Sequence, residues 1–86
     1  MKVRIPSPLR SYTEQKAWVE GDGGTVDELL RDLDRQFPGM RFRVVDEQGR
    51  LRTHMKIWIN QDAVRDLTTS VAPSDEITIM QALSGG

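Results

Sequence analysis

The sequence predicts an α+β domain in which a mixed β-sheet packs on one main helix. A helix signal with its own cap occupies residues 25–37, and segments that alternate apolar and polar residues, as strands do, lie on both sides of it. The chain has 86 residues, which is enough for one hydrophobic core and too few for two. A single amphipathic helix between two groups of strands therefore predicts two layers around one core.

The central helix has clear signals at both ends. Thr25 followed by Glu28 is a capping box, in which the threonine hydroxyl accepts a hydrogen bond from an early backbone N–H and the glutamate reaches back. The apolar residues that follow have helical spacing and form one stripe, which consists of Val26, Leu29, Leu30, Leu33 and Phe37. Pro38 and Gly39 are expected to end the helix.

Two short strands are expected before the helix, over residues 1–5 and 16–20. The short link between them favours an antiparallel hairpin. The second strand is too short to show which side faces the core, Trp18 or the pair Ala17 and Val19.

Two further strands are expected after the helix, over residues 53–60 and 76–83, because apolar residues alternate with polar ones in both. Residues 40–45 are ambiguous, since their alternation fits a strand while a short helical turn also fits. Residues 9–15 and 60–62 are expected to form turns.

The connection through the helix determines the predicted topology. A right-handed crossover places the first and last strands side by side as a parallel pair, and the helix then covers one face of the sheet. This arrangement is an α+β domain of the β-grasp type. We expect the domain to span residues 1–82 and residues 83–86 to form a flexible C-terminal tail.

The outer face of the predicted sheet is a candidate partner-binding surface. It carries Arg4, Trp58 and Met80, and Leu83 follows at the start of the tail. An exposed tryptophan beside a methionine is typical of interface anchors. Alternatively, lysine or arginine stems on the same sheet half cover Trp58. Both interpretations stay open at this point.

The composition argues against several classes of function. Twelve Lys and Arg residues oppose 13 Asp and Glu residues, so the basic footprint of a nucleic-acid-binding protein is missing. A local basic cluster is expected on a solvated face beside two acids; it comprises Arg41, Arg43, Arg50 and Arg52, beside Asp46 and Glu47. No apolar run reaches the length of a membrane span and no signal-peptide core is present, so we expect a cytoplasmic protein.

The side chains offer little catalytic chemistry. The sequence has no cysteine, which excludes an internal disulfide and a thiol nucleophile. His54 is the only histidine and is expected at a strand start. One histidine without cysteines or a patterned carboxylate cluster does not make a zinc site or a catalytic triad. We therefore predict no metal site and no catalytic side chain.

The most informative functional feature is the end of the sequence, Leu83-Ser84-Gly85-Gly86. Glycines lack a Cβ atom, so they can enter a narrow slot and present the last carboxylate to the active site of another protein. This pattern favours a folded body that delivers its own C-terminus as the reactive group. The alternative is a frayed end, in which glycine is also common.

The order of elements and the terminal glycines resemble ubiquitin and, more closely, the prokaryotic sulfur carrier proteins. This family includes the molybdopterin synthase small subunit and the thiamine sulfur carrier. The resemblance rests on residues 2–6, 9–10, 37–39, 49–51, 55–60 and 75–79, with Asp62, Val64, Arg65, Ser84, Gly85 and Gly86. Within the family, the carriers of thiocarboxylate-dependent cysteine biosynthesis are the most similar. Residues 80–84 lack the proline-containing run of the molybdopterin subunits, which disfavours that role.

The resemblance implies a protein co-substrate rather than an enzyme, with no bound cofactor. A separate adenylating enzyme would use ATP to convert the Gly86 carboxylate to an acyl-adenylate, and a sulfur donor would convert it to a thiocarboxylate. The implied partners are that enzyme, a sulfurtransferase or sulfide source, a sulfur-accepting biosynthetic enzyme that makes cysteine or a related metabolite, and a processing metalloprotease. Alternatives are a protein modifier joined through Gly86 to lysines, a molybdopterin synthase small subunit, and a β-grasp binding module with an incidental tail.

Overall fold

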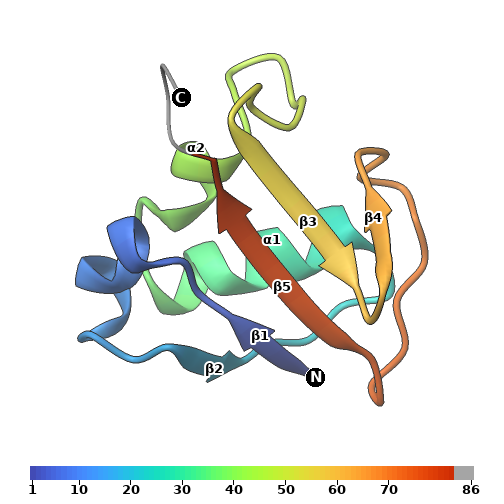
Figure 1. The fold of residues 1–86 in the computed structure, drawn as a ribbon, viewed down its shortest axis with the longest axis horizontal. Helices are drawn as coiled ribbons and strands as arrows, with labels where there is room; N and C mark the ends of the chain where they lie inside the picture. Colours follow the sequence, from blue (N-terminus) through green and yellow to red (C-terminus); the bar gives the residue numbers. More distant parts are fainter. Residues whose placement is uncertain (83–86) are drawn as a thin grey trace.

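A computed structural model describes residues 1–82 of the chain (Figure 1). Its elements in order are β1 (Lys2–Arg4), the 3-10 helix η1 (Ser7–Thr13), β2 (Trp18–Glu20), α1 (Val26–Gln36), α2 (Met40–Val44), β3 (Met55–Ile59), β4 (Asp62–Val64) and β5 (Glu76–Gln81). The expected tail, residues 83–86, lies outside the described residues. Within residues 1–82, no helix combines the length and the apolar character that crossing a membrane requires.

The strands form one mixed five-stranded sheet in the order β2-β1-β5-β3-β4. Strand β1 pairs antiparallel with β2 and parallel with β5, so that Val3 lies opposite both Val19 and Ile77. On its other side β5 pairs antiparallel with β3. The predicted hairpin and the parallel pairing of the first and last strands are therefore confirmed, and β5 is the central strand.

Helix α1 covers one face of this sheet (Figure 1), and its start is built as the capping box predicts. The Thr25 hydroxyl accepts a hydrogen bond from the Glu28 backbone N–H at 3.2 Å. The Glu28 carboxylate accepts one from the Gly24 N–H at 2.8 Å, one residue before the cap. The stripe of α1 is buried at Val26, Leu29, Leu30 and Leu33, and Phe37, the residue that ends the helix, is half-buried.

The hydrophobic core lies between α1 and the inner face of the sheet. The buried strand residues include Val3, Ile57, Ile77 and Ile79, and Ile5, directly after β1, is buried with them. Val19 also faces this core, whereas Trp18 is 42% exposed on the outer face. The structure thereby resolves the orientation of the second strand, because the register fixes which side of so short a segment is buried.

Three segments differ from or refine the predictions. The turn expected over residues 60–62 is confirmed at Asn60, where φ is 54°, but Asp62 already begins β4, which pairs antiparallel with β3. The turn expected over 9–15 lies largely within η1, whose buried Leu9 packs in the core. The ambiguous segment 40–45 forms α2, in which Met40 and Val44, one helical turn apart, are both buried.

The predicted strand boundaries are too wide at several ends. Strand β5 ends at Gln81 instead of continuing to residue 83, and β3 begins at Met55 instead of residue 53. Residues 53–54 form the turn before β3, which periodicity alone does not distinguish from a strand start.

Candidate functional site

The candidate site is the place where the chain leaves the central strand β5 toward its terminal glycines. Among residues 1–82, the Ala82 backbone N–H donates a hydrogen bond to the His54 carbonyl oxygen at 2.7 Å. His54 is exposed and lies directly before β3, next to the strand start at which the sequence places it. Its backbone rather than its imidazole therefore anchors the base of the tail.

Arg65 stabilises the loop that carries this anchor. Its guanidinium donates hydrogen bonds to the carbonyl oxygens of Leu51 at 3.1 Å and Met55 at 3.3 Å. A third contact, to the Arg52 carbonyl oxygen, is at 3.5 Å. Because the donor comes from the segment after β4, Arg65 connects that segment to the turn around His54. This role of Arg65 is not predictable from the sequence, since a single arginine gives no signal of its partners.

The outer face of the sheet brings the predicted partner-binding residues together. Arg4 and Trp58 both pair with Thr78 of β5, one from each side, so they lie in one row across the sheet. The row continues to Trp18, which pairs with Arg4 and whose ring lies 5.7 Å from the Arg4 guanidinium carbon. Met80 lies two residues further along β5, toward the tail.

Trp58 and Met80 differ in exposure. The Trp58 side chain is half-buried, whereas Met80 is 46% exposed. The indole N–H of Trp58 is covered, and it has no hydrogen-bond partner among residues 1–82. Trp58 is thus a partly covered residue at the centre of the face, with the exposed Met80 in a neighbouring row.

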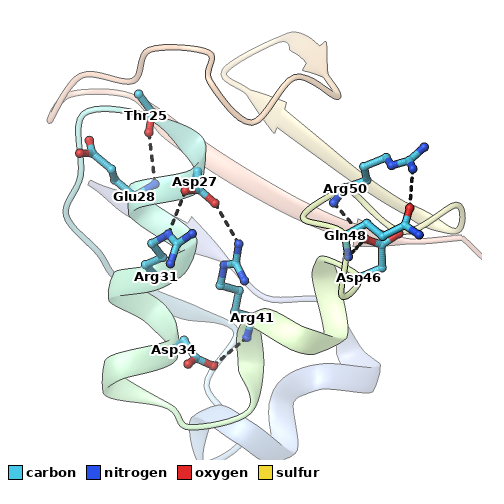
Figure 2. Close-up of polar contacts among 9 residues, drawn as sticks. All are labelled: Thr25, Asp27, Glu28, Arg31, Asp34, Arg41, Asp46, Gln48 and Arg50. Atoms are coloured by element: carbon cyan, nitrogen blue, oxygen red, sulfur yellow. Dashed lines mark hydrogen bonds and ion pairs between the residues drawn. The ribbon is translucent and has the colours of Figure 1, made fainter.

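The structure separates Arg41 from the rest of the expected basic cluster. Arg41 does not lie on an open face beside Asp46: its guanidinium pairs with Asp27 of α1 at 3.1 Å, and its backbone N–H donates to Asp34 at 3.1 Å (Figure 2). This expectation was wrong because the helix-to-helix contact joins residues far apart in the sequence. A hydrogen bond from Arg31, reinforced by Arg41, holds the pKa of the Asp27 carboxyl below its ordinary value.

The Asp46 carboxylate stabilises the turn that follows α2 (Figure 2). Its carboxylate accepts hydrogen bonds from the backbone N–H groups of Gln48 at 2.8 Å and Arg50 at 3.0 Å. The bond from Arg50, followed by that from Gln48, lowers the pKa of the Asp46 carboxyl. This acid is therefore a turn residue rather than a catalytic one.

Residues 1–82 contain no group of three or more His, Asp and Glu residues placed to hold a metal ion. The predicted reactive residue Gly86, with Leu83, Ser84 and Gly85, lies outside the described residues. The described residues provide two features: the end of β5, after which His54 anchors Ala82, and the outer face of the sheet beside it.

The sequence is similar both to a protein family and to individual known proteins. Residues 3–86 match the ThiS family. The sulfur carrier protein CysO of Mycobacterium tuberculosis is 33% identical over 89 residues, which cover 98% of this chain and 96% of the relative. The small archaeal modifier protein 3 of Haloferax volcanii is 25% identical over 91 residues, covering 100% and 98%.

A solved structure is also similar to this chain. A chain in the crystal structure of the Amycolatopsis orientalis BexX/CysO complex superposes with a TM-score of 0.91 at 33% identity, covering 99% of this chain and 98% of that one. The similarity spans both chains almost completely, so it confirms the β-grasp architecture predicted from the order of elements. The chain belongs to the ThiS family.

Proposed function

We propose that this chain is a sulfur carrier whose Gly86 carboxylate is activated by a separate adenylating enzyme. In the first step the carboxylate attacks the α-phosphorus of ATP, giving an acyl-adenylate and pyrophosphate. In the second step sulfide attacks the acyl carbon and AMP leaves, so that a thiocarboxylate replaces the carboxylate. With a persulfide donor, the terminal sulfur attacks and AMP leaves to give an acyl disulfide. A thiol then attacks the donor's sulfur and breaks the S–S bond, which releases the thiocarboxylate while the thiol is oxidised to a disulfide with the donor.

The chemistry explains why the carrier needs no catalytic side chain. A free carboxylate is a poor electrophile, and adenylation gives it a good leaving group. The thiocarboxylate that results is anionic at neutral pH and, like thiolates, a good nucleophile. The carrier contributes a carboxylate on a narrow glycine pair and a folded body that positions it.

The observation that carries this proposal is the family match over residues 3–86, which includes the terminal Gly85 and Gly86. The fixed base of the tail supports it, because the Ala82–His54 hydrogen bond lies four residues before the carboxylate. The named relatives support it further: the Mycobacterium tuberculosis protein is a sulfur carrier. We extend this to cysteine or a related metabolite as the sulfur-containing product.

The test is ATP–pyrophosphate exchange with the adenylating enzyme of the same genome. Deleting Gly86, or replacing it (Gly86→Ala), should abolish exchange while the circular dichroism spectrum and the melting temperature remain those of the wild type. Ser84→Ala, which leaves both glycines in place, is the matched control and should retain exchange. Equal exchange by the deletion variant and the wild type would exclude the proposal.

We propose that the outer face of the sheet docks this activating enzyme through Trp58, Met80, Arg4 and Leu83. The support is the juxtaposition of the first three in two adjacent rows next to the strand end. The covered indole N–H without a partner adds a donor that an oxygen of the enzyme would satisfy after a small rotation of the ring.

A second function has support from one relative, the small archaeal modifier protein. In that case the activated Gly86 would form an amide with a lysine of a target protein, and AMP would leave. Activation is shared by both functions, so exchange does not separate them. A remnant of residues 66–86, which trypsin leaves because Arg65 is the last basic residue, linked through Gly86 to target lysines in digests of the host would favour the modifier.

A further inference from the structure

A concave site lies beside the base of the tail, on the helix side of the sheet. It has a volume of about 700 Å³, and its lining includes Phe42 and Arg43 of α2, Arg52 and His54 before β3, and Gln81 at the end of β5. His54 accepts the hydrogen bond that anchors Ala82. Whatever occupies this site therefore contacts Gln81 and His54, the residue that anchors Ala82, from the side opposite to Trp58.

The lining of the site carries an excess of positive charge, because two arginines and one acid line it. Neither Arg43 nor Arg52 forms an ion pair with any of residues 1–82. The nearest acid, Asp46, also lines the site, but its Oδ1 atom accepts two backbone N–H groups of its own turn. Two guanidinium groups thus face one carboxylate that is already hydrogen-bonded.

Arg52 is held in a defined orientation. Its Nε donates to the Phe42 carbonyl oxygen at 2.8 Å, and its guanidinium carbon lies 4.6 Å from the centre of the Phe42 ring. Within the described residues its terminal nitrogens have no hydrogen-bond acceptor. A guanidinium fixed through Nε and by stacking presents its terminal nitrogens to a carboxylate without further loss of side-chain freedom.

An apolar surface completes the site. The Phe42 side chain is 56% exposed, although aromatic residues are usually buried, and it forms one wall beside the two arginines. An exposed aromatic ring next to paired cations is complementary to a segment that alternates acidic and apolar residues. A nucleic acid fits less well, because the chain has a net charge of -1 and Asp46 lines the same site.

We propose that this site binds an acidic segment of the adenylating enzyme, with carboxylates on Arg43 and Arg52 and an apolar side chain on Phe42. The inference rests on the proposed function for the identity of the partner. Its consequence is that the enzyme contacts the base of the tail on two sides, at this site and at the outer sheet face. Contact on both sides fixes the direction in which the residues after Ala82 enter the enzyme.

The test compares charge-reversal variants in ATP–pyrophosphate exchange with the adenylating enzyme of the same genome. Arg43→Glu should raise the KM for the carrier about tenfold and leave kcat unchanged, because docking weakens while the reacting carboxylate is intact. Lys16→Glu is the matched control: it reverses one charge at an exposed residue before β2 and should leave KM unchanged.

Ionic strength provides a second readout. It uses Arg43→Glu rather than an Arg52 variant, because replacing Arg52 would remove its structural hydrogen bond to the Phe42 carbonyl oxygen. The wild-type KM should rise with salt, and the KM of Arg43→Glu should rise less, since one interfacial charge pair is gone. An equal KM for Arg43→Glu and Lys16→Glu, with the same salt dependence, would overturn the inference. Wild-type carrier without any exchange would instead exclude the proposed function, so the two failures are distinguishable.

Discussion

Arg65 provides a quantitative test of how the base of the tail is held. Arg65→Met keeps an unbranched stem of similar length and removes the charge and all its donors. The lost contacts are two hydrogen bonds, at 3.1 and 3.3 Å, and one contact at the 3.5 Å limit. Hydrogen bonds from charged groups contribute about 1.5–3 kcal/mol each, and exposure of Arg65 reduces this to about 1 kcal/mol each. We expect the free energy of unfolding to fall by about 2 kcal/mol.

Arg65→Met should lower the protection of the Ala82 amide by more than it lowers the free energy of global unfolding. Urea unfolding gives the global change, and amide hydrogen exchange of Ala82, whose N–H donates to the His54 carbonyl, reports the anchor directly. Arg31→Met is the matched control, because Arg31 forms an exposed ion pair with Asp27, and exposed ion pairs contribute little to stability. Equal urea midpoints for the two variants, or unchanged exchange at Ala82, would refute the assignment of Arg65.

Three further predictions concern the core, acid stability and docking. Leu33→Ala empties a fully buried position of α1 and should lower the free energy of unfolding by about 3–4 kcal/mol, measured by urea unfolding; a loss below about 1 kcal/mol would contradict the core assignment. The lowered pKa values of Asp27 and Asp46 contribute stability that is present above their ordinary pKa and is lost as pH falls through the folded values. The urea midpoint should therefore decline below about pH 4, and a flat profile to pH 2 would speak against it. Trp58→Ala should weaken the complex with the adenylating enzyme by about 2 kcal/mol in calorimetry, and unchanged affinity would remove Trp58 from the interface.

The elements that sequence predicts well are those whose signals are local. The capping box of Thr25 and Glu28 and the stripe that includes Leu33 define α1 without reference to the rest of the chain. The alternation around Ile57 and Ile79 correctly assigns the buried face of β3 and β5. The parallel pairing of β1 and β5 follows from the handedness of the crossover, which is a general rule.

The elements that sequence does not predict depend on tertiary partners. Strand β4 is short and its side chains are not deeply buried, so only its pairing with β3 makes it a strand. Met40 and Val44 fit both a strand and a helix, because a spacing of four satisfies both periods. The contact of Arg41 with Asp27 and the concave site beside Gln81 join segments distant in sequence, and no local pattern encodes them.

The most direct measurement is intact mass spectrometry of the protein purified from its native host and of the recombinant protein treated with the adenylating enzyme, ATP and sulfide. We expect a species heavier by the replacement of one oxygen with sulfur, which fragmentation places at Gly86. This species should be absent when Gly86 is deleted. A free carboxylate as the only form in both preparations, with active adenylating enzyme present, would contradict the sulfur-carrier function.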